Sequence, residues 1–161
     1  MKILVSDQIS FEGVETLQKE ADVDVITKLK EDELVEIIGN YDGLVVRSGT
    51  QVTERIIENA HNLKVIGRAG VGVDNINLDA ATRRGIVVLN TPEGNTVAAA
   101  EHTIAMLMAL ARNIPAANAS LKAGEWKRNN FMGIEVKDKI IGIIGLGKIG
   151  TEVARKAIGL G

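Results

Sequence analysis

A glycine-rich turn near the end of the chain carries the clearest chemical signal in the sequence. Residues 140–144 are a short apolar run, and Gly-Leu-Gly-Lys-Ile-Gly follows directly as residues 145–150. Apolar residues then recur at three- and four-residue steps, which predicts a helix. A strand, a Gly-x-Gly-x-x-Gly turn and a helix, in that order, form the phosphate-binding turn of dinucleotide-binding folds. The pattern predicts a dinucleotide site, and a purely structural glycine turn is the alternative.

The three glycines of this turn have different predicted tasks. Gly145 permits the tight turn, Gly147 lets a pyrophosphate approach the backbone, and Gly150 lets the helix and strand pack closely. The helix presents unpaired N–H groups and the positive end of its dipole to a phosphate. The acidic residue that holds the ribose usually stands about 20 residues further on, beyond residue 161. We therefore expect the chain to be the front part of a longer enzyme, and the choice between NAD and NADP stays open.

Two arginines stand at the ends of predicted strands. Arg47 follows the apolar run Gly43–Val46, and Arg68 stands in the glycine-rich sequence that follows the next apolar run. Ligands of open α/β sheets bind outside the carboxyl ends of the strands, and a guanidinium suits carboxylate or phosphate. The turns beside the arginines, which include Ser48 and Gly70, can add backbone N–H groups. We predict a small-anion site here; the alternative is that each arginine pairs with a surface carboxylate.

A loop and a long apolar helix are predicted after the last of these strands. Residues 90–94 have the composition of a hinge, and Asn95 or Thr96 is expected to cap a helix over residues 97–111. Most of that helix is apolar or small, so it must be buried in a core or against another subunit. His102 is expected to be a structural, hydrogen-bonding histidine. No spacing of histidines or carboxylates predicts a metal site, and cysteine is absent.

Residues 1–91 must position the two arginines. They alternate short apolar runs with helical patterns, and the runs are continuous, which predicts a parallel sheet with helices on both faces. Five strands in about ninety residues fit the flavodoxin-like order better than an eight-unit barrel. The predicted strands are residues 3–5, 22–26, 43–46, 64–66 and 86–89, with Ser10, Thr53 and Asn77 as helix caps.

Composition narrows the possible classes of protein. The chain has 161 residues, 45% of them hydrophobic and 25% charged, and a net charge of −2. This near-neutral balance gives no reason to expect nucleic acid or an anionic membrane as a partner. The most apolar segment is too short to span a bilayer, and the amino terminus has no signal-peptide pattern. We therefore expect a cytoplasmic, soluble protein.

These motifs together resemble the D-2-hydroxyacid dehydrogenase family. The resemblance implies reversible hydride transfer between a small anionic 2-hydroxy acid and NAD. It also implies that residues 1–91 form a flavodoxin-like substrate-binding (lid) domain and that residues 92–161 begin a Rossmann NAD-binding domain. The long helix, residues 97–111, would then form a homodimer interface. The segments that carry the resemblance are residues 47–50, 65–76, 100–103, 112–115 and 145–150.

The resemblance also implies roles for single residues. Arg47 and Arg68, with Ser48 and Gly70, would bind the anionic groups of the substrate. The catalytic arginine, glutamate and histidine of the family have no matching positions in this sequence, so no catalytic residue is predicted here. The residues expected at the coenzyme are Val71, Asn95 and Thr96 near the nicotinamide, and Gly145, Gly147, Lys148, Ile149 and Gly150 at the pyrophosphate.

Other functions remain open at this point. Glyoxylate and hydroxypyruvate reductases and the D-lactate and formate dehydrogenases share the scaffold, so the exact 2-hydroxy acid is not determined. The isolated chain could instead be a non-catalytic module that associates with itself through residues 97–111. A small flavodoxin-like regulator that binds an anion through Arg47 is a third possibility, which the glycine turn makes less attractive.

Overall fold

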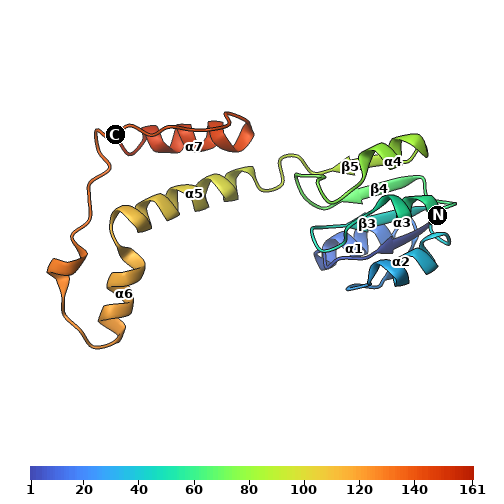
Figure 1. Cartoon of the computed structure of the whole chain (residues 1–161), viewed down its shortest axis with the longest axis horizontal. Helices are drawn as coiled ribbons and strands as arrows, with labels where there is room; N and C mark the ends of the chain where they lie inside the picture. The colour runs from blue at the N-terminus through green and yellow to red at the C-terminus, as the bar shows by residue number, and fades with distance from the viewer. The chain divides into compact units, whose positions relative to one another are not determined.

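The computed structural model describes residues 1–161 and divides into two compact units, Met1–Gly94 and Asn95–Gly161. The first unit is built on a five-stranded sheet in the order β2-β1-β3-β4-β5, with every pair of neighbouring strands parallel (Figure 1). This is the predicted flavodoxin-like order. The strands are β1 (Lys2–Val5), β2 (Asp22–Val25), β3 (Gly43–Val46), β4 (Val65–Arg68) and β5 (Val87–Asn90).

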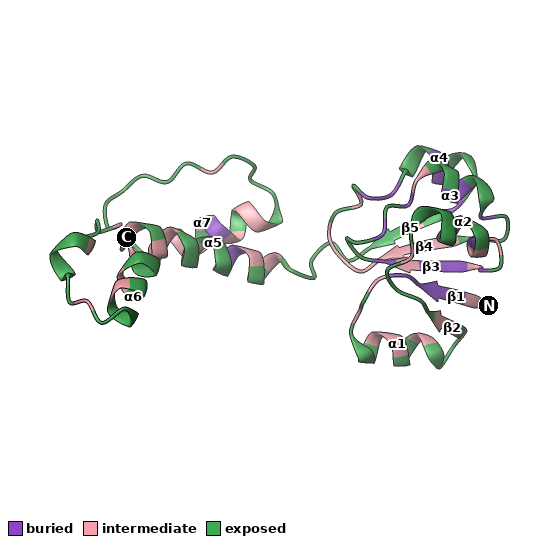
Figure 2. Ribbon diagram, turned by 60° about the horizontal axis from the view of Figure 1, so that its bottom comes forward, coloured by how far each residue is buried: buried purple, intermediate pink, exposed green.

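Four helices connect these strands. Helix α1 lies on one face of the sheet, and α2, α3 and α4 lie on the other, as Figure 2 shows. The predicted caps are confirmed: the side chains of Ser10, Thr53 and Asn77 each accept a hydrogen bond from a backbone N–H in the first turn. The helices are α1 (Phe11–Gln18), α2 (Glu31–Ile38), α3 (Glu54–Asn59) and α4 (Leu78–Arg83).

The hydrophobic core of the first unit lies between the sheet and helices α2 to α4 (Figure 2). Alternate side chains of the central strands point into it, because successive residues of a strand face opposite sides of the sheet. Burying each large aliphatic side chain stabilises the fold by roughly 2 kcal/mol. The core includes Leu4, Leu44 and Ile66 from the strands and Leu34, Ile38, Ile56 and Ile57 from the helices.

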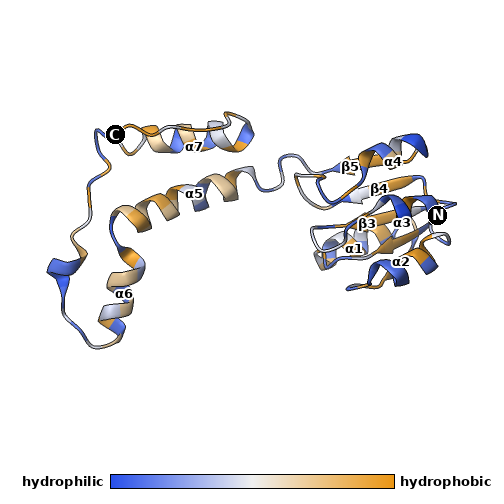
Figure 3. Ribbon diagram, in the orientation of Figure 1, coloured by the Kyte–Doolittle hydropathy of each residue, from blue (hydrophilic) through white to orange (hydrophobic).

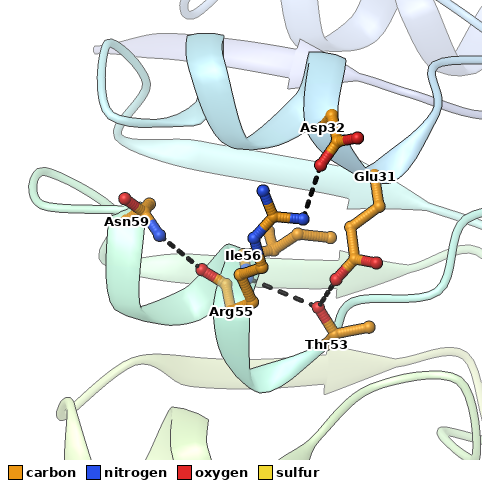
Figure 4. Close-up of polar contacts among 6 residues, drawn as sticks. All are labelled: Glu31, Asp32, Thr53, Arg55, Ile56 and Asn59. Carbon is orange, nitrogen blue, oxygen red and sulfur yellow. Dashed lines mark hydrogen bonds and ion pairs between the residues drawn. The ribbon is translucent and has the colours of Figure 1, made fainter.

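Polar contacts connect α2 to α3 on the solvent side of this core (Figure 4). The Thr53 hydroxyl donates to Glu31 Oε1 at 2.5 Å, and Arg55 Nη1 donates to Asp32 Oδ1 at 2.5 Å. Both Arg55 and Asp32 are largely exposed, so their ion pair contributes little to stability. Arg55 is therefore an arginine whose guanidinium can be removed at small cost.

Charged side chains surround the amino-terminal end of β1. Lys2 Nζ lies 3.0 Å from Asp24 Oδ2, and the Tyr41 hydroxyl donates to the same oxygen at 2.8 Å. Lys64 Nζ lies 2.8 Å from Asp42 Oδ1, and the Lys2 backbone N–H donates to the other Asp42 oxygen at 2.9 Å. The bond from Lys64, followed by the one from Lys2, lowers the pKa of Asp42. The bonds from Lys2 and then Tyr41 lower the pKa of Asp24.

These contacts predict a loss of stability in acid. A carboxyl group whose pKa is lower in the folded than in the unfolded chain stabilises the fold above the unfolded pKa, near pH 4. That contribution disappears as the pH falls through the lower, folded value. We expect Asp42→Asn to lower the melting temperature at pH 7. The melting temperature of the variant should also fall less steeply than that of the wild type as the pH is lowered from about pH 5 to pH 2. Thermal melts monitored by circular dichroism measure both effects.

The matched control is Glu36→Gln on α2. The Glu36 side chain is exposed and makes no hydrogen bond or ion pair, so its removal is expected to leave the acid limb of the stability curve unchanged. An Asp42→Asn curve that runs parallel to the wild-type curve over the whole range would contradict the prediction.

The second unit contains two long helices that pack together. Figures 1 and 2 show α5 and α7 side by side, running in the same direction, so that their N-termini lie at the same end of this unit. Ala100 and Val153 are buried between them, and Lys156 Nζ lies 3.3 Å from Glu101 Oε1. The helices of this unit are α5 (Thr96–Ala111), α6 (Ile114–Lys122), the 3-10 helix η1 (Arg128–Phe131) and α7 (Lys148–Ile158).

The predicted strand before the glycine turn is absent. Residues 140–144 belong to no strand, and the side chains of Ile140 and Ile144 are fully exposed. A strand is defined by its hydrogen bonds to a neighbour, and the second unit contains no other strand to pair with. The strand at residues 140–144 is therefore not formed within one chain. An apolar segment cut off from its sheet neighbours is expected either to lack regular structure or to pair with a second copy of the chain, and that pairing is a prediction.

Helix α5 differs from expectation in two ways. Only Ala100 of this helix is buried, whereas Val97, Met106 and Leu110 are more than half exposed. Figure 3 shows that α5 is apolar along most of its length, so an apolar surface faces outward. His102 is also exposed and makes no hydrogen bond, so the prediction of a structural, hydrogen-bonded histidine is wrong. No helix of the chain is both long enough and apolar enough to cross a bilayer.

Candidate functional site

The two predicted anion-binding arginines lie next to each other at the carboxyl ends of β3 and β4. Val46, the last residue of β3, pairs with Arg68 across the two strands, and Arg47 follows directly. The Arg47 side chain is exposed, and its guanidinium makes no hydrogen bond or ion pair within the protein. The alternative in which Arg47 pairs with a surface carboxylate is therefore wrong, and its planar donors are free for a ligand.

Arg68 is held more firmly than Arg47. Its side chain is half-buried, and Nε donates to Asn75 Oδ1 at 3.2 Å. A methyl group placed on Gly70 would lie 2.4 Å from Arg68 Nη1, so the guanidinium lies against the bare backbone of this glycine. Gly70 therefore provides the space that lets Arg68 turn inward, a role that sequence reasoning did not assign to it.

Asp7 organises the loop that carries Arg47. Its Oδ2 accepts hydrogen bonds from the backbone N–H groups of Arg47 at 2.7 Å and Thr50 at 3.0 Å. Its Oδ1 accepts from the Thr50 hydroxyl at 3.0 Å. Ser48 and Gly49 lie between these anchors, are exposed, and use their N–H groups in no hydrogen bond. The loop therefore combines a free guanidinium with two free backbone donors.

Sequence reasoning missed Asp7, although a signal was present. Asp7 follows β1 closely, as Arg47 follows β3, and the predicted sheet order makes these two strands neighbours. The carboxyl ends of neighbouring parallel strands lie at one edge of the sheet. Asp7 could therefore have been placed beside the Arg47 loop from the sequence.

The loop after β4 is fixed by the last residue of β5 and the residue that follows it. Asn90 Nδ2 donates to the Val71 carbonyl oxygen at 2.6 Å, and the Thr91 N–H donates to the Gly70 carbonyl oxygen at 2.9 Å. The first unit thus gathers five predicted site residues at one sheet edge. They are Arg47, Ser48, Arg68, Gly70 and Val71.

The glycine turn before α7 has the backbone that a phosphate-binding turn requires. Gly145 has φ +93°, a conformation that side chains rarely adopt. A methyl group on Gly150 would stand 2.1 Å from the Gly145 carbonyl oxygen, whereas one on Gly147 would meet nothing within 4 Å. No side chain caps α7 at its N-terminus. The turn is closed at Gly150 and open at Gly147, so it fits an incoming pyrophosphate.

The other predicted coenzyme residues of the second unit lie at the starts of α5 and α7. Asn95 precedes the helix, but its side chain makes no capping hydrogen bond, so the capping prediction is wrong for this residue. Thr96 is the first helical residue, and its hydroxyl is buried without a partner. Because α5 and α7 begin at the same end of the unit, both residues lie on the side of the glycine turn (Figures 1 and 2). Lys148 and Ile149 form the first turn of α7.

The sequence profile of the family described as D-isomer specific 2-hydroxyacid dehydrogenase, catalytic domain, matches residues 3–160. The chain belongs to this family. A D-3-phosphoglycerate dehydrogenase of Synechocystis sp. is 56% identical to this family member over 160 residues, which are 99% of this chain and 29% of that protein. A D-3-phosphoglycerate dehydrogenase of Methanocaldococcus jannaschii is 51% identical over 161 residues, or 100% and 31% of the two chains. The chain thus spans about three tenths of these curated relatives.

Solved structures of the dehydrogenase family confirm the predicted α/β fold class. The 3-phosphoglycerate dehydrogenase of Entamoeba histolytica, solved with bound NAD+, superposes with a TM-score of 0.80 at 33% identity, covering 100% of this chain and 51% of that one. An acyclic imino acid reductase solved with NADPH and D-Arg gives a TM-score of 0.89 at 28% identity, covering 99% and 53%. These related structures bind nicotinamide coenzymes of both kinds.

Proposed function

We propose that this chain supplies the substrate-binding (lid) domain and the first phosphate turn of an NAD-dependent D-3-phosphoglycerate dehydrogenase. The reaction would oxidise D-3-phosphoglycerate to 3-phosphohydroxypyruvate, a step of serine biosynthesis. Residues 1–91 would form the lid, and residues 92–161 would begin the coenzyme domain. The observation that carries the proposal is that Arg47 and Arg68 stand at the adjacent carboxyl ends of β3 and β4, where the Arg47 guanidinium is free and the Arg68 guanidinium is held by Asn75.

The chemistry of the substrate matches this pair of arginines. D-3-phosphoglycerate carries a phosphate at one end and a carboxylate at the other, and both are anions that a guanidinium binds through paired hydrogen bonds. Arg47 would supply a mobile charge, and Arg68 a charge already oriented by Asn75. The free N–H groups of Ser48 and Gly49 would add neutral donors to the same anion. An uncharged substrate would leave these groups unsatisfied, so the site selects for an acid.

The residues of the second unit are suited to hold the coenzyme. The glycine turn, with Gly145, Gly147 and Gly150, would hold the pyrophosphate against the start of α7. When bound, a nicotinamide coenzyme accepts a hydride from the carbon that carries the substrate hydroxyl. We propose NAD as the coenzyme, as in the Entamoeba relative. Lys148 and Ile149 would lie over the pyrophosphate, and Val71, Asn95 and Thr96 near the nicotinamide.

The proposal predicts binding without turnover for the 161-residue chain. The acid–base residues of the family have no matching positions in this sequence, so we expect no NAD reduction when D-3-phosphoglycerate is added. In a chemical-shift titration, we expect D-3-phosphoglycerate to bind about tenfold more tightly than D-lactate, because the phosphate adds charge-assisted hydrogen bonds. Equal affinity for the two acids would point to another 2-hydroxyacid dehydrogenase, and measurable turnover would contradict the absence of the acid–base pair.

A second role is supported by the exposed apolar surface of α5. Val97, Met106 and Leu110 are 53%, 59% and 79% exposed, an unfavourable arrangement for a helix with so few polar residues. We propose that two copies cover this surface in a homodimer, so that the chain also acts as a self-associating module. Sedimentation velocity at tens of micromolar is expected to show a dimer, and Leu110→Lys should shift it to a monomer. A clean wild-type monomer would contradict this role.

A further inference from the structure

We propose that Asn75 is a positioning residue that sets the Arg68 guanidinium and the Arg47 loop in a fixed relation, so that one dianionic acid engages both arginines. The inference rests on the proposed function and extends it to a residue that contacts no substrate. Asn75 lies in the loop between β4 and α4, further along the chain than Arg68. It follows Arg68 by seven positions and reaches back to both loops through its side-chain amide.

The distribution of buried polar side chains singles out this region. Apart from Tyr41, the polar residues that are buried as whole residues are Ser6, Thr50 and Asn75. Ser6 Oγ lies 3.0 Å from Thr50 Oγ1, and Asn75 Nδ2 donates to the Thr50 carbonyl oxygen at 2.7 Å. Burying polar groups is costly unless they are hydrogen-bonded. All three belong to one connected network, which joins the loop after β3 to the loop after β4.

Both the nitrogen and the oxygen of the Asn75 side-chain amide bond to the arginine segments. Nδ2 donates to the Arg47 carbonyl oxygen at 2.8 Å as well as to that of Thr50, which fixes the loop after β3 at two points. Oδ1 accepts from Arg68 Nε at 3.2 Å, which orients the guanidinium at the end of β4. Because the amide is planar and 5% exposed, the three bonds share one rigid frame. Moving one loop therefore moves the other.

Arg68 is confined from a second side by Gly70. The close approach of Arg68 Nη1 to the Gly70 backbone leaves no room for a side chain at that position. The three atoms nearest to the methyl group of an alanine there all belong to the flexible Arg68 side chain. Gly70→Ala should therefore displace the guanidinium without disturbing the fold. It tests the same positioning as a change at Asn75, but without opening a hole in the buried network.

An effect of Asn75→Ala on ligand affinity must be separated from its effect on stability. The substitution removes buried hydrogen bonds and therefore lowers stability in any case. A positioning role makes the effect on ligand affinity depend on Arg68, whereas a purely structural role does not. The double-mutant cycle of Asn75→Ala and Arg68→Met measures that dependence. The probe is D-3-phosphoglycerate, titrated into the 15N-labelled 161-residue chain well below the melting temperature of each variant.

We expect Asn75→Ala and Gly70→Ala each to weaken D-3-phosphoglycerate binding by about tenfold, the effect of one lost hydrogen bond to a charged group. In the Arg68→Met background, Asn75→Ala should weaken binding much less. The Nε–Hε signal of Arg68 should exchange faster with water in Asn75→Ala than in the wild type. The matched control is Arg55→Met, which removes an exposed guanidinium of α3 (Figure 4) and should bind as the wild type does.

The outcomes separate this inference from the proposed function. If Arg68→Met weakens binding while Asn75→Ala and Gly70→Ala bind as the wild type does, the positioning role is overturned and the function stands. Equal effects of Asn75→Ala in the two backgrounds would also overturn it. If Arg47→Met and Arg68→Met both bind as the wild type does, the proposed function fails, and the positioning role with it.

Discussion

Replacing Arg47 by methionine is expected to weaken the binding of D-3-phosphoglycerate by about a hundredfold, with no change in melting temperature. The guanidinium has no partner within the protein, so its removal leaves no protein group unsatisfied. A paired contact between arginine and an anion contributes roughly 3 kcal/mol, which corresponds to a factor of about one hundred in affinity. Chemical-shift titration of the 161-residue chain measures the affinity, and a thermal melt measures the stability.

Two further variants sharpen this test. Arg47→Lys keeps the charge but not the planar fork of donors, so we expect it to recover only part of the affinity. Arg55→Met removes a guanidinium from the same unit and should leave binding unchanged. An Arg47→Met chain that binds as tightly as the wild type would remove the main support for an anion site at this sheet edge.

Much of the fold could be predicted because its signals are local. Continuous apolar runs separated by capped helices indicate a doubly covered parallel sheet, and the caps at Ser10, Thr53 and Asn77 lie where the sequence places them. The two arginines could be placed as well, since strand ends mark the ligand edge of such a sheet. The role of Asn75 could not be predicted, because nothing in the sequence around it reveals that its side-chain amide reaches the carbonyl group of Arg47.

The predictions that differ from the structure share a physical cause: contacts with other parts of the fold decide which local structure a segment adopts. Residues 140–144 have a strand composition, but a strand needs a hydrogen-bonded neighbour, and the second unit provides none. Helix α5 has the composition of a buried helix, yet α7 covers only one side of it. Asn95 has a suitable residue type for a cap, but its side chain accepts no backbone N–H. Local propensity predicted what each segment can form, and packing determined what it does form.

Gly150→Ala is expected to destabilise the second unit by roughly 3 kcal/mol and to abolish NAD binding by the chain. The added methyl group would stand 2.1 Å from the Gly145 carbonyl oxygen, a backbone atom that can move only if the turn opens. Opening the turn would displace the first residues of α7, which are proposed to hold the pyrophosphate. Thermal melts and an NAD titration of the same samples measure the two effects.

Two neighbouring glycines distinguish damage to the turn from damage to the coenzyme site. An alanine at Gly142 would meet no atom within 4 Å and lies outside the turn, so stability and NAD affinity should both stay at wild-type values. An alanine at Gly147 would also meet no protein atom, so the chain should keep its stability. The same methyl group would occupy the space proposed for the pyrophosphate, so NAD affinity should fall by about tenfold or more. If Gly147→Ala binds NAD as the wild type does, the open face of this turn is not a phosphate site.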